Sequence, residues 1–362
     1  MEFTKVGAGS FVAIILGIII AIVPLAIALI WKIRKKEKFT TVLVGAAAFL
    51  LFALVIEKPI QALLIMPTSL GLPDHAASIF INSRPALWAF VVGLFPGVFE
   101  ETGRFIAFKT VLRKRKNKET SISYGIGHGG FEAMYILGLS FVEYLVFAVM
   151  INTGSIDLIM SQLAATTTPD VVQANFEAIN ATGSITVGAV ALMTFERIFA
   201  VLFHIGASII VFYAARDKEK IWLYPLAILL HTVLDGIVGL NMAGVISIST
   251  WGLEAIVVVF GCAVFFGAFF LLYKKDRIDR IKAMETLYNS ALELTEKADT
   301  AELKNGQAII STLRQYYESP VWKKDFEADE KGLLPADLQR GVLSEDGLYN
   351  LLEKCKELLG DK

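Results

Sequence analysis

Two adjacent carboxylates lie in the middle of a long apolar stretch. Glu100 and Glu101 are followed three residues later by Arg104, and the surrounding run covers about 85–112. At ~1.5 Å per residue this run is long enough to cross a bilayer. A charged group at membrane depth is costly and usually marks a functional site or a buried ion pair. Glu101 and Arg104 on neighbouring turns fit an ion pair, but that pairing leaves Glu100 unexplained.

Three of the four histidines also lie in apolar runs, each in a different run: His128, His204 and His231. Counted from the nearest basic loops, these histidines and Glu101 all lie ~15–18 Å from the same side of the membrane. A lone histidine on an apolar helix is most often a packing residue. Unrelated packing residues have no reason to share a depth, so we expect one site built from four helices.

Two local spacings support such a site. His128 and Glu132 are four residues apart, as are His231 and Asp235, so each pair lies on one helix face. A carboxylate one turn away can fix the tautomer of an imidazole or raise its basicity. Each pair could equally be a buried polar pair.

Glycines surround His128, at positions 125, 127, 129 and 130. In a membrane helix, small residues allow another helix to approach closely. They could also leave the backbone open to a substrate strand, but close packing is the favoured interpretation.

Carboxylates and imidazoles at one buried site suit the activation of water. One route uses a metal ion such as zinc, held by His128, His204 and His231 with a carboxylate, which lowers the pKa of bound water. The other route is metal-free, with a glutamate as general base and imidazoles binding the oxyanion. Both routes lead to hydrolysis of an amide in or beside the membrane. The sequence has no Gly-x-Ser-x-Gly and no His-Glu-x-x-His, so neither a serine nucleophile nor the commonest zinc-protease motif is supported.

The composition places the chain among membrane proteins. Of its 362 residues 55% are hydrophobic and 19% charged, and the mean hydropathy is +0.59. The net charge of −1 indicates no nucleic-acid partner. The two cysteines, Cys262 and Cys355, are too few and too differently placed for a disulfide framework or a thiolate metal site.

We predict an all-α polytopic fold with seven transmembrane helices. The seven apolar runs cover about 10–31, 40–66, 85–112, 121–151, 184–215, 221–247 and 250–273. Alternate connections are rich in Lys and Arg, and the others have none, which places the N-terminus outside and the C-terminus in the cytoplasm. The first run is too long for a signal peptide and is read as a retained span. We expect the protein in the cell membrane of a bacterium.

The composition changes after the last apolar run. We predict a membrane domain over 1–275 and a small cytoplasmic helical domain over 276–362, with one helix over 301–317 and another that begins after Ser344. The charged faces of this tail indicate solvation, and it could also dock a protein partner. The polar outer loop 152–183 contains a helix start at Thr168, and it either lies on the membrane surface or covers the site.

These residues resemble a known group of enzymes. Glu-Glu plus Arg on one helix, His204 on another and His231-x-x-x-Asp235 on a third are similar to the CAAX-protease and bacteriocin-processing (CPBP) superfamily of intramembrane proteases. The two residues between Glu101 and Arg104 are closer to the PrsW-type spacing of that superfamily. The segment 127–132 looks like the YhfC-type intramembrane metalloproteases. The resemblance covers about 10–273.

The resemblance implies that Glu100 or Glu101 activates water, that His204 and His231 bind metal or stabilise the oxyanion, and that Asp235 takes a position held by Asn or Asp. Phenylalanine usually precedes the first of these histidines by four residues, and Ala200 stands there in this chain.

We therefore predict an intramembrane protease that acts on a membrane-embedded or membrane-anchored protein or peptide and that contacts membrane lipids. Glu101 is the expected general base, with Glu100 as its partner or substitute and Arg104 holding the pair. The expected metal or oxyanion ligands and the supporting groups are His128, His204, His231, Glu132 and Asp235. Two rivals remain open. A transporter of ions or metals would spread polar residues through the membrane, and a non-catalytic scaffold would use the polar cluster only to fix helix packing.

Overall fold

The computed structural model describes residues 2–297 and 300–359, and this part of the chain is helical with no strand. The chain divides into two compact units, Met1–Leu272 and Tyr273–Lys362. The predicted all-α, polytopic membrane fold is confirmed. The orientation of the termini stays a prediction.

Among the described residues, six helical segments are long and apolar enough to cross a membrane, and a seventh span arises when one bent pair is counted. The bent pair is α5 (Ala76–Asn82) and α6 (Pro85–Lys109), which meet at 108°. The other spans are built from α1 (Ala8–Ala21) with α2 (Val23–Lys35), α3 (Phe39–Ala48) with η1 (Phe49–Glu57) and α4 (Lys58–Ile65), α7 (Glu119–Thr153), α10 (Val187–Arg216), α11 (Leu223–Met242), and α12 (Thr250–Leu271). Helix α6 carries both glutamates and Arg104.

The four helices that carry the predicted site lie side by side in the membrane unit. Helix α6 packs along α11, α10 packs between α7 and α12, and α3 crosses α7. The α6–α11 crossing is very close, because a Cβ atom on Gly93 would lie 2.5 Å from the backbone nitrogen of Gly236. This contact fixes the depth of α6 relative to α11, and so of Glu101 relative to His231.

The glycines near His128 serve close helix packing, as expected. A Cβ on Gly127 would overlap the Val42 carbonyl oxygen on α3, and one on Gly129 would lie 2.8 Å from Cβ of His204 on α10. Two neighbouring helices therefore touch opposite faces of α7 beside His128. The second of these contacts brings His204 toward His128.

Two irregular segments also shape the site. The second span contains a nine-residue π-helix, η1, between two α-helical parts, and π-helical turns are frequent at functional sites. Helix α6 contains Pro96 in its interior, four residues before Glu100. A proline in a helix removes one backbone donor and one intrahelical hydrogen bond.

The polar loop after α7 forms a helical hairpin of α8 (Ile156–Thr166) and α9 (Pro169–Asn180), followed by η3 (Ala181–Ser184). Thr168 is the N-cap residue of α9, so the predicted helix start is confirmed. The segment before α1 is tied to this region by paired hydrogen bonds between Val6 and the Asn152 carboxamide, at 2.8 and 2.9 Å.

The second unit is a small helical domain with its own apolar core. Its helices are α13 (Arg277–Lys297), α14 (Thr300–Asn305), α15 (Gln307–Tyr317), α16 (Pro320–Glu330) and α17 (Glu345–Leu359), with the short η6 (Gly341–Leu343) before the last. The predicted single helix over 301–317 was wrong, because the chain breaks at Gly306, which becomes the N-cap of α15. Ser344 caps α17 as predicted, since its Oγ accepts from the Gly347 backbone N–H at 3.1 Å.

Candidate functional site

All the predicted site residues meet in the membrane unit. Helix α6 supplies Glu100, Glu101 and Arg104, α7 supplies His128 and Glu132, α10 supplies His204, and α11 supplies His231 and Asp235. Six of these eight side chains form one continuous network of hydrogen bonds and ion pairs, and the other two, Glu100 and His128, form a pair beside it. The expectation from depth alone, that four helices bring these groups together, agrees with this arrangement.

Glu100, His128 and His204 form a buried cluster of possible metal ligands. One nitrogen or oxygen atom from each lies within 4.8 Å of those from the other two. Glu100 Oε2 accepts from His128 Nε2 at 2.9 Å, and the rings of His128 and His204 are 5.0 Å apart. His128 Nδ1 is buried with no hydrogen-bond partner among the described residues. A buried nitrogen with an unused lone pair or proton is costly, so this cluster has unfilled coordination capacity.

This cluster differs from the three-histidine set that the sequence predicted. Glu100 replaces His231 as the third possible ligand. His231 instead contacts Glu101, whose Oε1 accepts from His231 Nδ1 at 2.9 Å. The ring of His231 still lies near His204, with centroids 5.3 Å apart. The histidines therefore divide between a ligand cluster and a separate carboxylate–imidazole pair.

Glu101 is locked in a buried ion pair. Arg104 Nη1 donates to both of its carboxylate oxygens, at 3.0 and 2.9 Å, and both side chains are 0% exposed. The far nitrogen of His231, Nε2, faces Asp235 at 3.5 Å. Because Glu101 accepts a hydrogen bond from Nδ1–H, it fixes the tautomer of His231. The unprotonated Nε2 then faces Asp235. In catalytic triads a buried carboxylate orients the imidazole through the same kind of hydrogen bond to Nδ1–H.

His204 bridges the two halves of the site. Arg104 Nη2 lies 3.2 Å from its Nδ1, and Glu132 Oε2 lies 2.6 Å from its Nε2. A guanidinium can only donate, so Nδ1 accepts and Nε2 carries the proton toward Glu132. An arginine is an unusual neighbour for a metal-binding histidine, whose second nitrogen ordinarily donates to a carboxylate or carbonyl.

Sequence reasoning left Arg197 outside the site. This arginine on α10 donates from Nη1 to Glu132 Oε1 at 3.2 Å and also contacts Glu196. It lies seven residues before His204, two turns along the same helix face, and this spacing was the only signal in the sequence. A second ion pair, between Glu57 and Lys58 at 3.0 Å, lies at the end of η1, with the Glu57 side chain 0% exposed.

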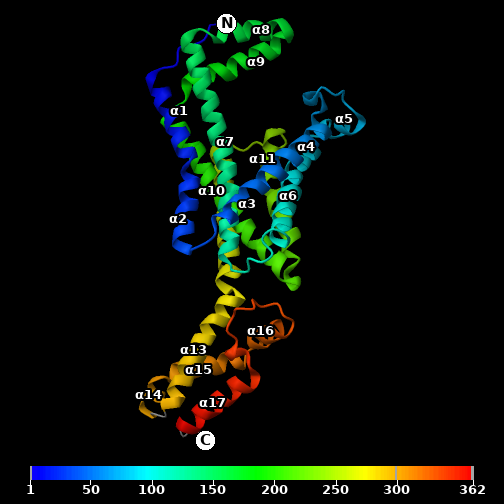
Figure 1. Ribbon diagram of the computed structural model, residues 1–362. Coiled ribbons are helices and arrows are strands. Elements are labelled where there is room, and N and C mark those ends of the chain that lie inside the picture. The colour runs from blue at the N-terminus through cyan, green and yellow to red at the C-terminus, as the bar shows by residue number, and fades with distance from the viewer. Residues whose placement is uncertain (1, 298–299, 360–362) are drawn as a thin grey trace. The chain divides into compact units, whose positions relative to one another are not determined.

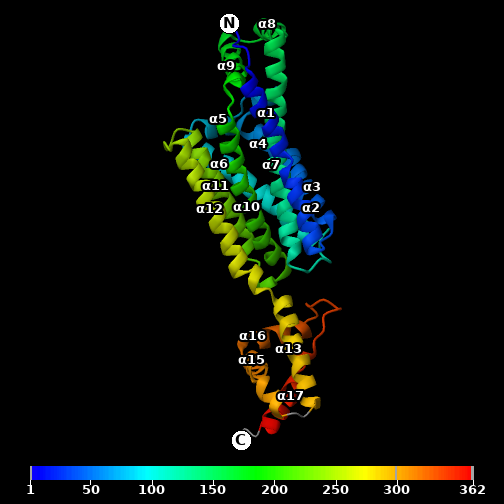
Figure 2. The ribbon, with the colours of Figure 1, turned by 90° about the vertical axis from the view of Figure 1, so that its left-hand side faces the viewer.

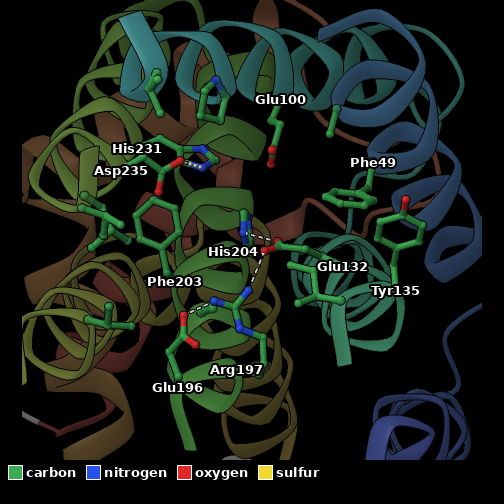
Figure 3. Close-up of a pocket in the computed structure, with 18 of the residues that line it drawn as sticks. Phe49, Glu100, Glu132, Tyr135, Glu196, Arg197, Phe203, His204, His231 and Asp235 are labelled. Carbon is green, nitrogen blue, oxygen red and sulfur yellow. Dashed lines mark hydrogen bonds and ion pairs between the residues drawn. The ribbon is translucent and has the colours of Figure 1, made fainter. Parts of the chain in front are cut away.

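A cavity of about 370 Å³ opens beside these groups (Figure 3). Its polar wall carries Glu100, Glu132, Arg197, His204, His231 and Asp235, and its apolar wall includes Phe49, Ala53, Val92, Pro96, Phe203 and Val238. Glu101, Arg104 and His128 do not line it. Of the two glutamates, only Glu100 therefore faces the space where a substrate can lie.

The donor set fits a divalent ion such as zinc. Two imidazoles and one carboxylate with one face open to a cavity are the ligands of many catalytic zinc sites, and the unpartnered His128 Nδ1 agrees with a cluster that is not satisfied by protein groups alone. The contact between Arg104 and His204 is the one feature that competes with metal binding.

Comparison with known proteins identifies relatives of both units. The family described as YhfC intramembrane metalloprotease matches residues 18–272. A separate family, described as a domain of unknown function (DUF4298), matches residues 281–361. The chain is 26% identical over 234 residues to a Bacillus subtilis (strain 168) protein named "Uncharacterized membrane protein YhfC", and this region is 64% of this chain and 84% of that protein. No solved structure matches the chain.

Proposed function

The chain belongs to the YhfC intramembrane metalloprotease family, and from this premise we propose that it is a peptidase that hydrolyses a peptide bond of a membrane-embedded or membrane-anchored protein. The observation that carries the proposal is the convergence of Glu100, His128 and His204 within 4.8 Å beside a cavity at membrane depth. Buried ionisable groups in a membrane are costly unless they serve a function, and this set matches the chemistry of water activation.

Glu100, His128 and His204 would hold the metal ion. When bound, such an ion supplies Lewis-acid chemistry, which polarises a carbonyl and acidifies water. Glu132 supports the cluster through its 2.6 Å contact with His204 Nε2. Arg197 in turn holds Glu132, at 3.2 Å, so the outer part of the cluster is fixed by a charge pair from two helices.

His231 is assigned the transfer of a proton. Its Nδ1–H is held by Glu101, and its Nε2 points to the cavity wall near Asp235. In the proposed reaction water adds to the carbonyl carbon and the C–N bond breaks. Nε2 accepts a proton from the water and donates it to the departing amine. The expected role of Glu101 as general base gives way to a positioning role, because its side chain is enclosed by Arg104 and His231.

The test is a cleavage assay with the full chain in proteoliposomes. Membrane proteins from a bacterial extract are added, and new peptide N-termini are labelled and identified by mass spectrometry. We expect new termini with the wild-type protein and none with Glu100→Gln or His231→Ala. Glu143→Gln is the matched control, since Glu143 is an exposed residue of α7 away from the cavity.

Absence of new termini with well-folded, metal-supplemented wild-type protein would reject the peptidase proposal. The non-catalytic scaffold would then be the better account of the same buried cluster. Equal cleavage by wild type and Glu100→Gln would reject the site rather than the activity.

A further inference from the structure

A helical substrate does not offer its peptide groups to the cavity. The backbone N–H and C=O groups of an α-helix are closed within its own hydrogen bonds. A bond that reaches Glu100 and His231 must therefore lie in a segment that has unwound.

An unwound segment at membrane depth needs hydrogen-bond partners. Each backbone N–H or C=O without a partner in an apolar medium costs several kcal/mol, so the enzyme must supply partners that the lipid cannot. Most of the cavity wall away from the charged groups is apolar, as the lining side chains Phe49, Ala53 and Phe203 show. Backbone groups of the enzyme are the remaining source.

Helix α6 offers such a group about two turns before Glu100. Pro96 has no N–H, so the carbonyl of Val92 loses its usual intrahelical donor. That carbonyl accepts instead from Gln61 Nε2 of α4, at 3.5 Å. This distance is at the outer limit for a hydrogen bond, and a carbonyl oxygen has two lone pairs. Both Val92 and Pro96 line the cavity.

We propose that the Val92 carbonyl, released by Pro96 and flanked by the Gln61 carboxamide, is a backbone-binding edge for an extended substrate segment. The inference rests on the proposed peptidase function and adds a substrate class to it. The substrates are membrane segments that contain residues which weaken a helix, such as glycine or polar residues, and uninterrupted helices are excluded. Pro96 is a positioning residue, and it acts through the carbonyl four residues before it.

The test measures binding and does not require turnover. Two synthetic peptides of about twenty Leu and Ala residues with Lys at each end span a bilayer; one is uninterrupted and the other has three central glycines. Each carries a photoreactive diazirine near its centre. The full-length protein in proteoliposomes is irradiated with each peptide, and labelled residues of the cavity are identified by mass spectrometry.

We expect the glycine-containing peptide to label the cavity, and the uninterrupted peptide to label it weakly. Pro96→Ala restores the missing N–H and should lower this labelling about 3- to 10-fold, the effect of about one hydrogen bond. Pro24→Ala is the matched control, because Pro24 also lies in a membrane helix but not at this cavity. It should leave labelling unchanged.

A modified probe keeps the test independent of how Pro96→Ala folds. N-methylation of the central amides removes the donors that the Val92 carbonyl would accept, and it should lower labelling of the unaltered protein by a similar factor. N-methylation near the peptide ends should not.

Equal cavity labelling by the two parent peptides, or by the centrally N-methylated peptide and its parent, would overturn the inference. If the labelling is as predicted but no new termini appear, the binding edge is supported and the proposed peptidase function is rejected. The two failures are therefore distinguishable.

Discussion

Glu100 and Glu101 are neighbours in sequence with opposite expected responses to the same substitution. Glu101 is paired with the fully buried guanidinium of Arg104 and with His231. Glu100 is paired with His128 and faces the cavity. Changing each to glutamine removes one charge and leaves shape nearly the same. We expect Glu101→Gln to damage folding and Glu100→Gln to damage function.

The magnitudes follow from what each change leaves behind. Glu101→Gln leaves the charge of Arg104, which is 0% exposed, without its counter-ion, and breaking a buried ion pair costs about 3–5 kcal/mol. Glu100→Gln keeps an oxygen that accepts from His128, so its cost is about 1 kcal/mol. At about 2–4 °C per kcal/mol, the melting temperature should fall by about 6–20 °C for the first and about 2–4 °C for the second.

The assay is thermal unfolding of both variants in the same detergent, followed by fluorescence and by the loss of soluble protein. Proteolysis is measured in parallel below the melting temperature of both. A larger loss of stability in Glu100→Gln than in Glu101→Gln would refute the assignment of Arg104 as the partner of Glu101. Cleavage by Glu100→Gln at the wild-type rate would refute the place of Glu100 at the site.

Two further changes test each unit separately. Glu132→Gln should weaken metal affinity about 10- to 100-fold, because this carboxylate supports the proposed ligand His204; equilibrium dialysis followed by elemental analysis measures it. Asp325→Asn should destabilise the C-terminal unit by about 1–3 kcal/mol, because the buried carboxylate accepts from Arg280 at 2.9 and 2.7 Å. The readout is alkylation of Cys355, which is buried and whose thiol pKa is raised by that burial, so it reacts fast only after unfolding.

Matched controls keep these two readouts specific. Glu143→Gln on the exposed face of α7 should leave metal affinity unchanged, and Asp337→Asn, at an exposed position of the second unit, should leave the alkylation rate unchanged. The alkylation is done with Cys262→Ser, so that one thiol remains. Unchanged metal affinity in Glu132→Gln, or unchanged alkylation in Asp325→Asn, would contradict the corresponding contact.

The sequence was sufficient to predict that these eight polar side chains lie close together, although it left out Arg197. Charged and imidazole groups are rare enough in apolar helices that their presence is informative, and counting from the basic loops placed His128, His204 and His231 in one layer with Glu101. Spans could be counted because apolar length is set by the bilayer. The glycines near His128 also indicated close packing correctly, since Gly127 touches the backbone of α3.

The roles within the site were beyond the sequence. Consecutive residues on a helix point about 100° apart, so spacing could not tell whether Glu100 or Glu101 faces the cavity. The contact between Arg197 and Glu132 could not be predicted, because pairings across helices have no local pattern in the sequence. For the same reason the sequence could not separate the proposed roles of His204 and His231. Those roles depend on the carboxylate that each imidazole contacts, Glu132 for His204 and Glu101 for His231.

Local irregularities were a third gap. The π-helix of η1 has no sequence signal that separates it from the α-helical turns before and after it. Pro96 was visible, but the consequence for the Val92 carbonyl depends on Gln61, which another span brings near. In the second unit, Gly306 divided a stretch that periodicity alone joined into one helix.

The most direct test of the central claim is the uptake of heavy oxygen during cleavage. The full chain in proteoliposomes is incubated with membrane proteins in water enriched in oxygen-18, and the new C-terminal carboxyl groups are weighed by mass spectrometry. Hydrolysis at this site predicts one heavy oxygen in each new carboxyl group with the wild-type protein, and no product with Glu100→Gln or His231→Ala. No cleavage by folded wild-type protein, or new carboxyl groups that arise equally with Glu100→Gln, would contradict the account.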